Sequence, residues 1–213
     1  MVLGYPGMWM KDPATGIDAV RLVHGEQGLR IHRLPAPEGE VIGRTKVTGL
    51  IDKGPGKGAL VYTERTVHDA ACGELLATLS STTFCRADGG FGGPTGPVKA
   101  VHELPARTSD HSLDFATQPR AALIYRLSGD YNPLHAEPAV ARAAGFERPI
   151  LHGLATYGIA GWALTRSVCG GDPHALRAMD VRFSSPVYPG ETIRTEVSVS
   201  YTHLRAHETR EDL

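Results

Sequence analysis

Long apolar runs, paired cysteines and an excess of charge are all missing from this sequence. No apolar stretch approaches the roughly 18 residues that a membrane-spanning helix needs, and no targeting segment is recognisable. The three cysteines are widely spaced and form no CxxC pair, which disfavours a metal or redox site. A formal net charge of −1 gives no overall attraction to nucleic acid or to an anionic membrane. We therefore expect a soluble cytoplasmic protein with reduced thiols, no bound metal and no nucleic-acid partner.

Residues 17–90 are rich in Val, Thr and Ile and are typical of strands and turns. "IDAVRLVHGEQGLRIHRLP" alternates apolar and polar residues, which predicts a half-buried antiparallel strand pair. "EVIGRTKVTGLIDKG" and "GALVYTERTVHDAACGELLATLSSTTFCRA" continue this pattern between glycine-bearing turns. From residue 88 to 112 glycine, proline and polar residues crowd together, as in an inter-domain linker.

After the linker the residue pattern changes from that of strands to that of helices. "TQPRAALIYRLSGD" predicts a helix capped by Thr117 and running to Gly129. "EPAVARAAGF" predicts a short helix that ends at Gly145. "GLATYGIAGWALTRSV" is apolar nearly all round, which is usual for a buried helix. "LRAMDVRFSSPVYPGETIRTEVSV" returns to strands, with "YPGE" as a turn. One buried helix enclosed by curved antiparallel strands indicates an α+β fold.

The stretch "GDYNPLH" has two interpretations. Asn132 followed by proline is a strong turn-former, so the segment could simply connect two helices, with His135 on the surface. Alternatively, the turn brings the Asp130 carboxylate and the His135 imidazole together around one water molecule. Such a pair is suited to acid–base catalysis near neutral pH, and Asn132 could orient either partner.

"PILHG" adds a glycine at the start of the apolar helix. Gly153 could serve close packing alone. It could also offer an unobstructed backbone N–H at a helix N-terminus, which carries partial positive charge and suits a developing oxyanion. Combined with an acid–base pair, such a donor indicates addition or removal of water next to a carbonyl group.

The segment "YRLSGDYNPLHAEPAVARAAGFERPILHGLATYG" resembles the signature of the MaoC-like, hydratase 2 family of (R)-specific enoyl-CoA hydratases. "FSSPVYPGE" is similar to the following strand and turn of that family. "LVHGEQ", "LIDKGPGKG" and "GGFGG" resemble the non-catalytic first half of its two-domain members. The resemblance implies a double hot-dog fold, in which each half wraps a sheet around a central helix.

The resemblance also implies roles for particular residues. Asp130 and His135 correspond to the catalytic pair, Asn132 supports them, and the Gly153 N–H is the oxyanion donor. A lysine in "LIDKG" would bind coenzyme A phosphates as a point charge. The implied substrate and coenzyme A contacts are His24, Gly25, Lys53, Tyr131 and Phe183.

The implied reaction is reversible syn hydration of a trans-2-enoyl-CoA to a (3R)-3-hydroxyacyl-CoA, in fatty-acyl metabolism. It needs no metal or other cofactor, since the coenzyme A thioester is the substrate. The family implies a homodimer, and a peroxisomal location if the source is eukaryotic. Two alternatives remain open: a non-catalytic acyl-CoA-binding hot-dog protein and a hot-dog thioesterase.

The predicted organisation is an N-terminal half (1–93), a linker (94–114), a catalytic half (115–198) and a non-native tail (199–213). By the resemblance, Met1 falls in the middle of the first half, and strands expected after the segment 191–197 are missing. "VSYTHLRAHET" resembles the translation of a sequencing-library transposon adapter. We expect unpaired sheet edges, an incompletely covered central helix and low stability.

Overall fold

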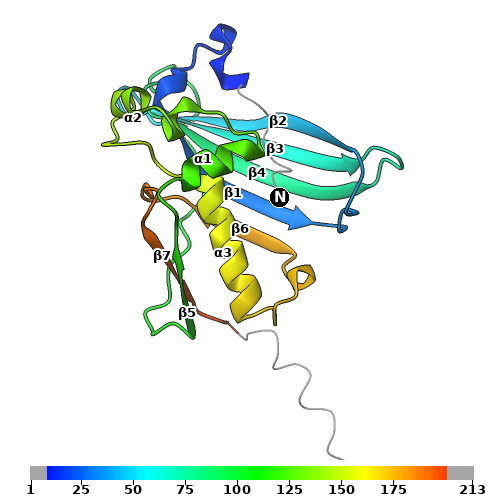
Figure 1. Cartoon of the computed structure of the whole chain (residues 1–213). Helices are drawn as coiled ribbons and strands as arrows, with labels where there is room; N and C mark the ends of the chain where they lie inside the picture. The colour runs from blue at the N-terminus through cyan, green and yellow to red at the C-terminus, as the bar shows by residue number, and fades with distance from the viewer. Residues whose placement is uncertain (1–8, 201–213) are drawn as a thin grey trace, which may run out of the picture.

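The computed structural model describes residues 9–200 and has an α+β architecture of two antiparallel sheets and a central helix, α3 (Figure 1). Five strands form one sheet in the order β2-β3-β4-β1-β6, and two form the other, β5-β7. The strands are β1 (Leu22–Ile31), β2 (Val41–Asp52), β3 (Ala59–Asp69), β4 (Leu75–Cys85), β5 (His111–Ala116), β6 (Ala178–Arg182) and β7 (Thr192–Val197). The α-helices are α1 (Ala121–Tyr125), α2 (Pro138–Ala143) and α3 (Gly153–Ser167). Short 3₁₀ helices are η1 (Trp9–Lys11), η2 (Pro13–Thr15), η3 (Ala19–Arg21), η4 (Arg126–Ser128), η5 (Pro133–His135) and η6 (Pro173–Ala175).

Strands β2, β3 and β4 form the antiparallel meander that the alternating pattern predicts. Val67 pairs with Gly43 of β2 on one side and with Ala77 of β4 on the other. Val67 is fully buried and packs with Ala77 and Leu79. The segment 17–35, by contrast, contributes one strand and a 3₁₀ helix, so the predicted strand pair is wrong there.

Strand β6 joins the two halves of the chain in one sheet. It pairs antiparallel with β1, Leu29 opposite Met179. The register of β1 against β4 shifts between His24 and Glu26, which is a β-bulge. At this bulge the Phe183 N–H donates to the Gly25 carbonyl, 2.9 Å away. The bulge therefore turns the end of β1 toward the residues that follow β6.

Helix α3 lies between the five-stranded sheet and the β5-β7 pair (Figure 1). The Tyr157 hydroxyl donates to the Met179 carbonyl of β6 at 2.9 Å, and Trp162 packs edge-on against Phe115 of β5. The predicted helix bounds are confirmed, but its predicted burial is wrong. Within residues 153–167 only Ala163 is fully buried, and Trp162 is 42% exposed.

Two boundary predictions need correction. Thr117 caps no helix, because its hydroxyl donates to the Glu191 carbonyl at 2.7 Å and accepts the Gly190 N–H at 2.9 Å. It ties β5 to the turn before β7, and α1 begins four residues later, at Ala121. Strand β5 begins at His111, inside the predicted linker 94–114. Most of the predicted tail 199–213 lies outside the described residues.

Within residues 9–200 no helix has the length and apolar character needed to cross a membrane. That finding agrees with the absence of long apolar runs from the sequence.

Candidate active site

A cavity of about 730 Å³ lies where the two halves of the chain meet. Strands β1, β3 and β4 and the turn after β2 line it from the first half, and the turn before α2, the start of α3 and the end of β6 line it from the second. The predicted site residues that line it are His24, Gly25, Lys53, Asp130, Asn132, His135, Gly153 and Phe183. Tyr131 is not among its lining residues. It is 61% exposed and its ring packs under the Arg126 guanidinium, so its predicted substrate contact finds no support in this geometry.

The turn from Asp130 to His135 is shaped by its own polar groups. The Asn132 side-chain oxygen accepts the Leu134 N–H at 3.3 Å and caps the 3₁₀ helix η5, which Pro133 begins. The Asn132 backbone N–H donates to an Asp130 carboxylate oxygen at 3.1 Å. Asn132 therefore orients Asp130, but through its main chain, while its side chain holds the turn.

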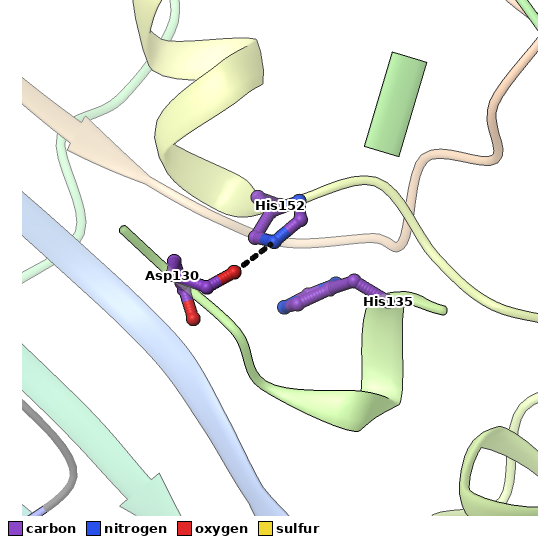
Figure 2. A group of neighbouring side chains, drawn as sticks. All are labelled: Asp130, His135 and His152. Atoms are coloured by element: carbon purple, nitrogen blue, oxygen red, sulfur yellow. Dashed lines mark hydrogen bonds between the residues drawn. The ribbon is translucent and has the colours of Figure 1, made fainter. Parts of the chain in front are cut away.

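Leu134 anchors this turn in the interior. It is buried with Ala141 and Ala144 of the α2 region, and Phe146 and Ile150 pack against the same cluster. With the turn fixed in this way, the Asp130 and His135 side chains point toward each other (Figure 2). One side-chain oxygen of Asp130 and one ring nitrogen each of His135 and His152, the atoms that could bind a metal ion, all lie within 4.8 Å of one another.

The hydrogen bonds decide the tautomer of His135. Its Nδ1 lies 2.9 Å from the Ile150 carbonyl oxygen, which can only accept, so Nδ1 carries the proton. Its Nε2 is consequently an acceptor, on the side of the ring that faces Asp130 (Figure 2). A neutral imidazole in this tautomer can take a proton from a water molecule in the cavity.

His152 completes the site, although the sequence analysis assigned it no role. It is 1% exposed and stacks on His135 with ring centroids 3.7 Å apart. Its Nε2–H donates to the Asp130 backbone carbonyl at 3.2 Å (Figure 2), so its Nδ1 is unprotonated. That buried Nδ1 has no hydrogen-bond partner among the described residues. The His-Gly pair in "PILHG" is the sequence signal that could have indicated it.

Burial keeps the histidines of the site uncharged. It lowers the pKa of His135, opposed by the hydrogen bond to Ile150 and by the charge of Asp130. Burial, and then the neighbouring His135, lower the pKa of His152 to about 4. Burial also lowers the pKa of His24, which hydrogen-bonds Ser81 and packs against Phe183. At neutral pH the negative charge of Asp130 therefore faces neutral imidazoles.

The cluster of Asp130, His135 and His152 has the residue types of a metal site, but its geometry fits an acid–base pair better. Lone pairs of imidazole lie in the ring plane, and the two rings are stacked only 27° from parallel. One nitrogen of each ring already donates to a backbone carbonyl. Each ring is therefore left with one unprotonated nitrogen.

Gly153 begins α3, directly after His152. Its N–H has no acceptor inside the helix, because the first N–H groups of a helix never do. A Cβ at this position would lie 3.2 Å from the Phe183 ring, so glycine permits the ring to approach the helix N-terminus. Gly153 also lines the cavity, so its backbone N–H is a candidate donor for an oxygen that gains negative charge.

The fold and this site define an α+β protein with an acid–base pair and an amide donor in a cavity between two halves. The family model described as "MaoC like domain" matches residues 100–211, and "MFE-2 hydratase 2 N-terminal domain" matches residues 7–87. The chain belongs to the MaoC-like dehydratase family, as the motifs predict. The first of these matches also runs through most of the predicted non-native tail.

Curated relatives carry related names. The chain is 44% identical to "3-hydroxyacyl-thioester dehydratase Y" of Mycobacterium tuberculosis, over 83% of this chain and 61% of the relative. It is 40% identical to "Enoyl-CoA hydratase 2, peroxisomal" of Arabidopsis thaliana, over 87% of this chain and 62% of the relative. The chain thus spans about three fifths of the length of these relatives.

Solved structures confirm the fold. A MaoC-like dehydratase from Phytophthora capsici matches with a TM-score of 0.77 at 41% identity, covering 86% of this chain and 63% of that one. A Mycobacterium tuberculosis protein described as having a double hotdog fold matches with a TM-score of 0.59, over 82% of this chain and 62% of that one. At 20% identity, the latter bears on the fold alone. The predicted double hot-dog fold is confirmed.

Proposed function

We propose that this protein is an (R)-specific 2-enoyl-CoA hydratase, which adds water syn across a trans-2-enoyl-CoA and also catalyses the reverse dehydration. The observation that carries the proposal is the convergence of three groups on one cavity. These are the Asp130 carboxylate, the unprotonated Nε2 of His135 and the N–H of Gly153. The names of the relatives, enoyl-CoA hydratase 2 and 3-hydroxyacyl-thioester dehydratase, support the same reaction class.

In the proposed mechanism Asp130 and His135 hold one water molecule between them. His135 accepts a proton from it through Nε2, because Nδ1 already donates to Ile150. The water oxygen bonds to Cβ of the enoyl group, and the proton that His135 took from the water is delivered to Cα on the same face. Meanwhile the Gly153 N–H stabilises the thioester oxygen, where charge builds as the carbon–carbon double bond is lost.

The substrate is placed by residues of both halves. Lys53, exposed at the cavity wall with its Nζ 4.9 Å from the Phe84 ring centroid, is proposed to bind coenzyme A phosphates. His24, Gly25 and Phe183 lie together at the β1 bulge, next to Gly153, and are proposed to hold the thioester region. The reaction as proposed needs no cofactor besides the coenzyme A thioester itself.

Further parts of the proposal follow the relatives. We propose a role in fatty-acyl metabolism, a homodimeric assembly, and no nucleic-acid or membrane partner. We propose a cytoplasmic location, or a peroxisomal one in a eukaryote, as the name of the Arabidopsis relative suggests.

The test is a hydration assay of purified protein with a medium-chain trans-2-enoyl-CoA and stereochemical analysis of the product. Loss of the conjugated double bond with formation of the (3R)-3-hydroxyacyl-CoA is the expected result. Release of free coenzyme A thiol would instead indicate a thioesterase. Binding of the acyl-CoA without turnover would indicate a binding protein, and the (3S) product would overturn the proposed stereochemistry.

A further inference from the structure

Asp52, the last residue of β2, is a buried carboxylate outside the catalytic cluster. It is 4% exposed, and a buried charge is rare unless polar partners compensate it. One of its oxygens accepts the N–H groups of Gly54 and Gly90 at 2.8 and 2.7 Å. The other accepts the Gly92 N–H at 2.8 Å. These backbone donors, Gly90 first, lower the pKa of Asp52, so the carboxylate stays ionised.

The three donors come from two different loops. One is the turn of residues 53–58 between β2 and β3. The other is the glycine loop, residues 89–93, which follows β4 by a few residues. A Cβ on Gly89 would clash with the Gly54 carbonyl, and one on Gly90 would lie 3.0 Å from Pro55. Glycine thus lets the two backbones touch, and Asp52 fastens them together.

The clamped turn carries Lys53, which is adjacent to Asp52 in sequence. The Lys53 N–H donates to the Gly58 carbonyl at 3.1 Å, which closes the turn. Its side chain is exposed, passes over Phe84 and lines the cavity. Asp52 itself is not among the cavity-lining residues. Any influence of Asp52 on a ligand must therefore pass through the turn that it holds.

We propose that Asp52 is a positioning residue for the coenzyme A end of the substrate. By clamping the glycine loop to the 53–58 turn, it holds Lys53 where the cavity opens. This inference rests on the proposed function, since it assumes an acyl-CoA substrate. A flexible lysine loses side-chain and backbone freedom when it binds a phosphate, and a turn fixed in advance reduces that loss.

The first experiment compares two substrates with the variant Asp52→Asn. Asparagine keeps the shape, but it replaces one acceptor oxygen by a donor that opposes backbone N–H groups. We expect KM for the enoyl-CoA to rise about tenfold, roughly the value of one hydrogen bond to a charged group. KM for the pantetheine thioester of the same acyl group, which lacks the nucleotide, should stay unchanged, as should kcat for both substrates. An equal loss on both substrates, or no loss on either, would overturn the inference.

The chain provides a matched control in Asp69, at the opposite end of β3. Its carboxylate also accepts two backbone N–H groups, from Ala71 at 2.8 Å and Cys72 at 3.3 Å, but it lies away from the cavity. Asp69→Asn therefore removes the same kind of interaction from a turn that meets no substrate. It should leave the KM values for both substrates unchanged.

A double-mutant cycle tests whether Asp52 acts through Lys53. Lys53→Met should raise KM for the enoyl-CoA, while Lys57→Met, in the same turn but not on the cavity wall, should not. The double variant Asp52→Asn/Lys53→Met should be no worse than Lys53→Met alone, because the two residues act on one contact. Fully additive losses would overturn the inference.

Two further measurements keep the outcome decisive. If Asp52→Asn fails to fold, Gly90→Ala strains the glycine loop at φ +93° and should give the same selective rise in KM. Calorimetric binding of free coenzyme A gives a readout without turnover. If the unsubstituted protein shows no hydration but Asp52→Asn binds coenzyme A more weakly than it does, the inference is supported and the proposed function is refuted. Normal hydration with unchanged coenzyme A binding by the variant would refute the inference alone.

Discussion

Replacing His135 by glutamine separates a catalytic role from a structural one. A glutamine amide can still donate to the Ile150 carbonyl, but it offers no unprotonated ring nitrogen to a water molecule. The structural loss is mainly the stacked contact with His152, worth about 0.5–1.5 kcal/mol. Loss of an acid–base partner costs about 10²–10⁴-fold in rate, or roughly 3–5 kcal/mol of barrier. Activity should therefore fall far more than stability.

The assay is the initial rate of enoyl-CoA hydration, measured together with thermal unfolding of the same preparation. His135→Gln and Asp130→Asn should each abolish measurable hydration while unfolding remains cooperative. The double variant should be no slower than the slower single variant, because both residues act on one water molecule. His32→Gln, an exposed histidine that hydrogen-bonds Thr78, is the control and should retain full activity. Near-normal turnover by either site variant would refute the assignment.

Three further predictions follow from the same geometry. The pKa of His135 is lowered by burial, so its neutral form persists below its ordinary value of about 6.5; kcat/KM should be flat near neutrality and fall only at more acidic pH, and a fall already above pH 7 would contradict this. His152→Phe keeps the stack but removes the Nε2–H bond to the Asp130 carbonyl; kcat should drop while stability, measured by urea unfolding, changes by less than about 1 kcal/mol, because the unpartnered buried Nδ1 is removed too. Thr117→Val leaves the Glu191 carbonyl and its neighbouring N–H without their hydroxyl partner and should cost about 1–3 kcal/mol in the same assay, whereas an unchanged midpoint would show that water replaces it.

The features that the sequence predicted well are those determined by residues adjacent in the chain. The turn from Asp130 to His135 depends on Asn132 and on the proline directly after it, so its shape could be predicted from turn chemistry. Turn chemistry alone gave no role to His152, because that role arises when the start of α3 packs against a turn 22 residues earlier in the chain. Thr117 looked like a helix cap, but a partner 74 residues away outcompeted the local one.

The same distinction holds for the sheets. Alternating residues predicted β2, β3 and β4, whose partners are consecutive in sequence. Nothing in the alternation indicated that β6 pairs with β1, about 150 residues away. Nor did it indicate the bulge next to Gly25, since a bulge is a property of paired strands rather than of one strand. These long-range pairings place the proposed substrate contacts, whereas a local turn places the proposed catalytic pair.

The division of the site between the halves has a mechanical consequence. The catalytic turn belongs to the second half, and the Lys53 turn belongs to the first, so the distance between them depends on the contacts that join the halves. Two such contacts are the β1–β6 pairing and the hydrogen bond that the Arg86 guanidinium donates to the Ala144 carbonyl at 3.0 Å. A coenzyme A thioester whose phosphates were bound by Lys53 would reach the acid–base pair only if both of these contacts stay in place. Under the proposed function, the first half would contribute to catalysis by fixing the span between the phosphate contact and the thioester.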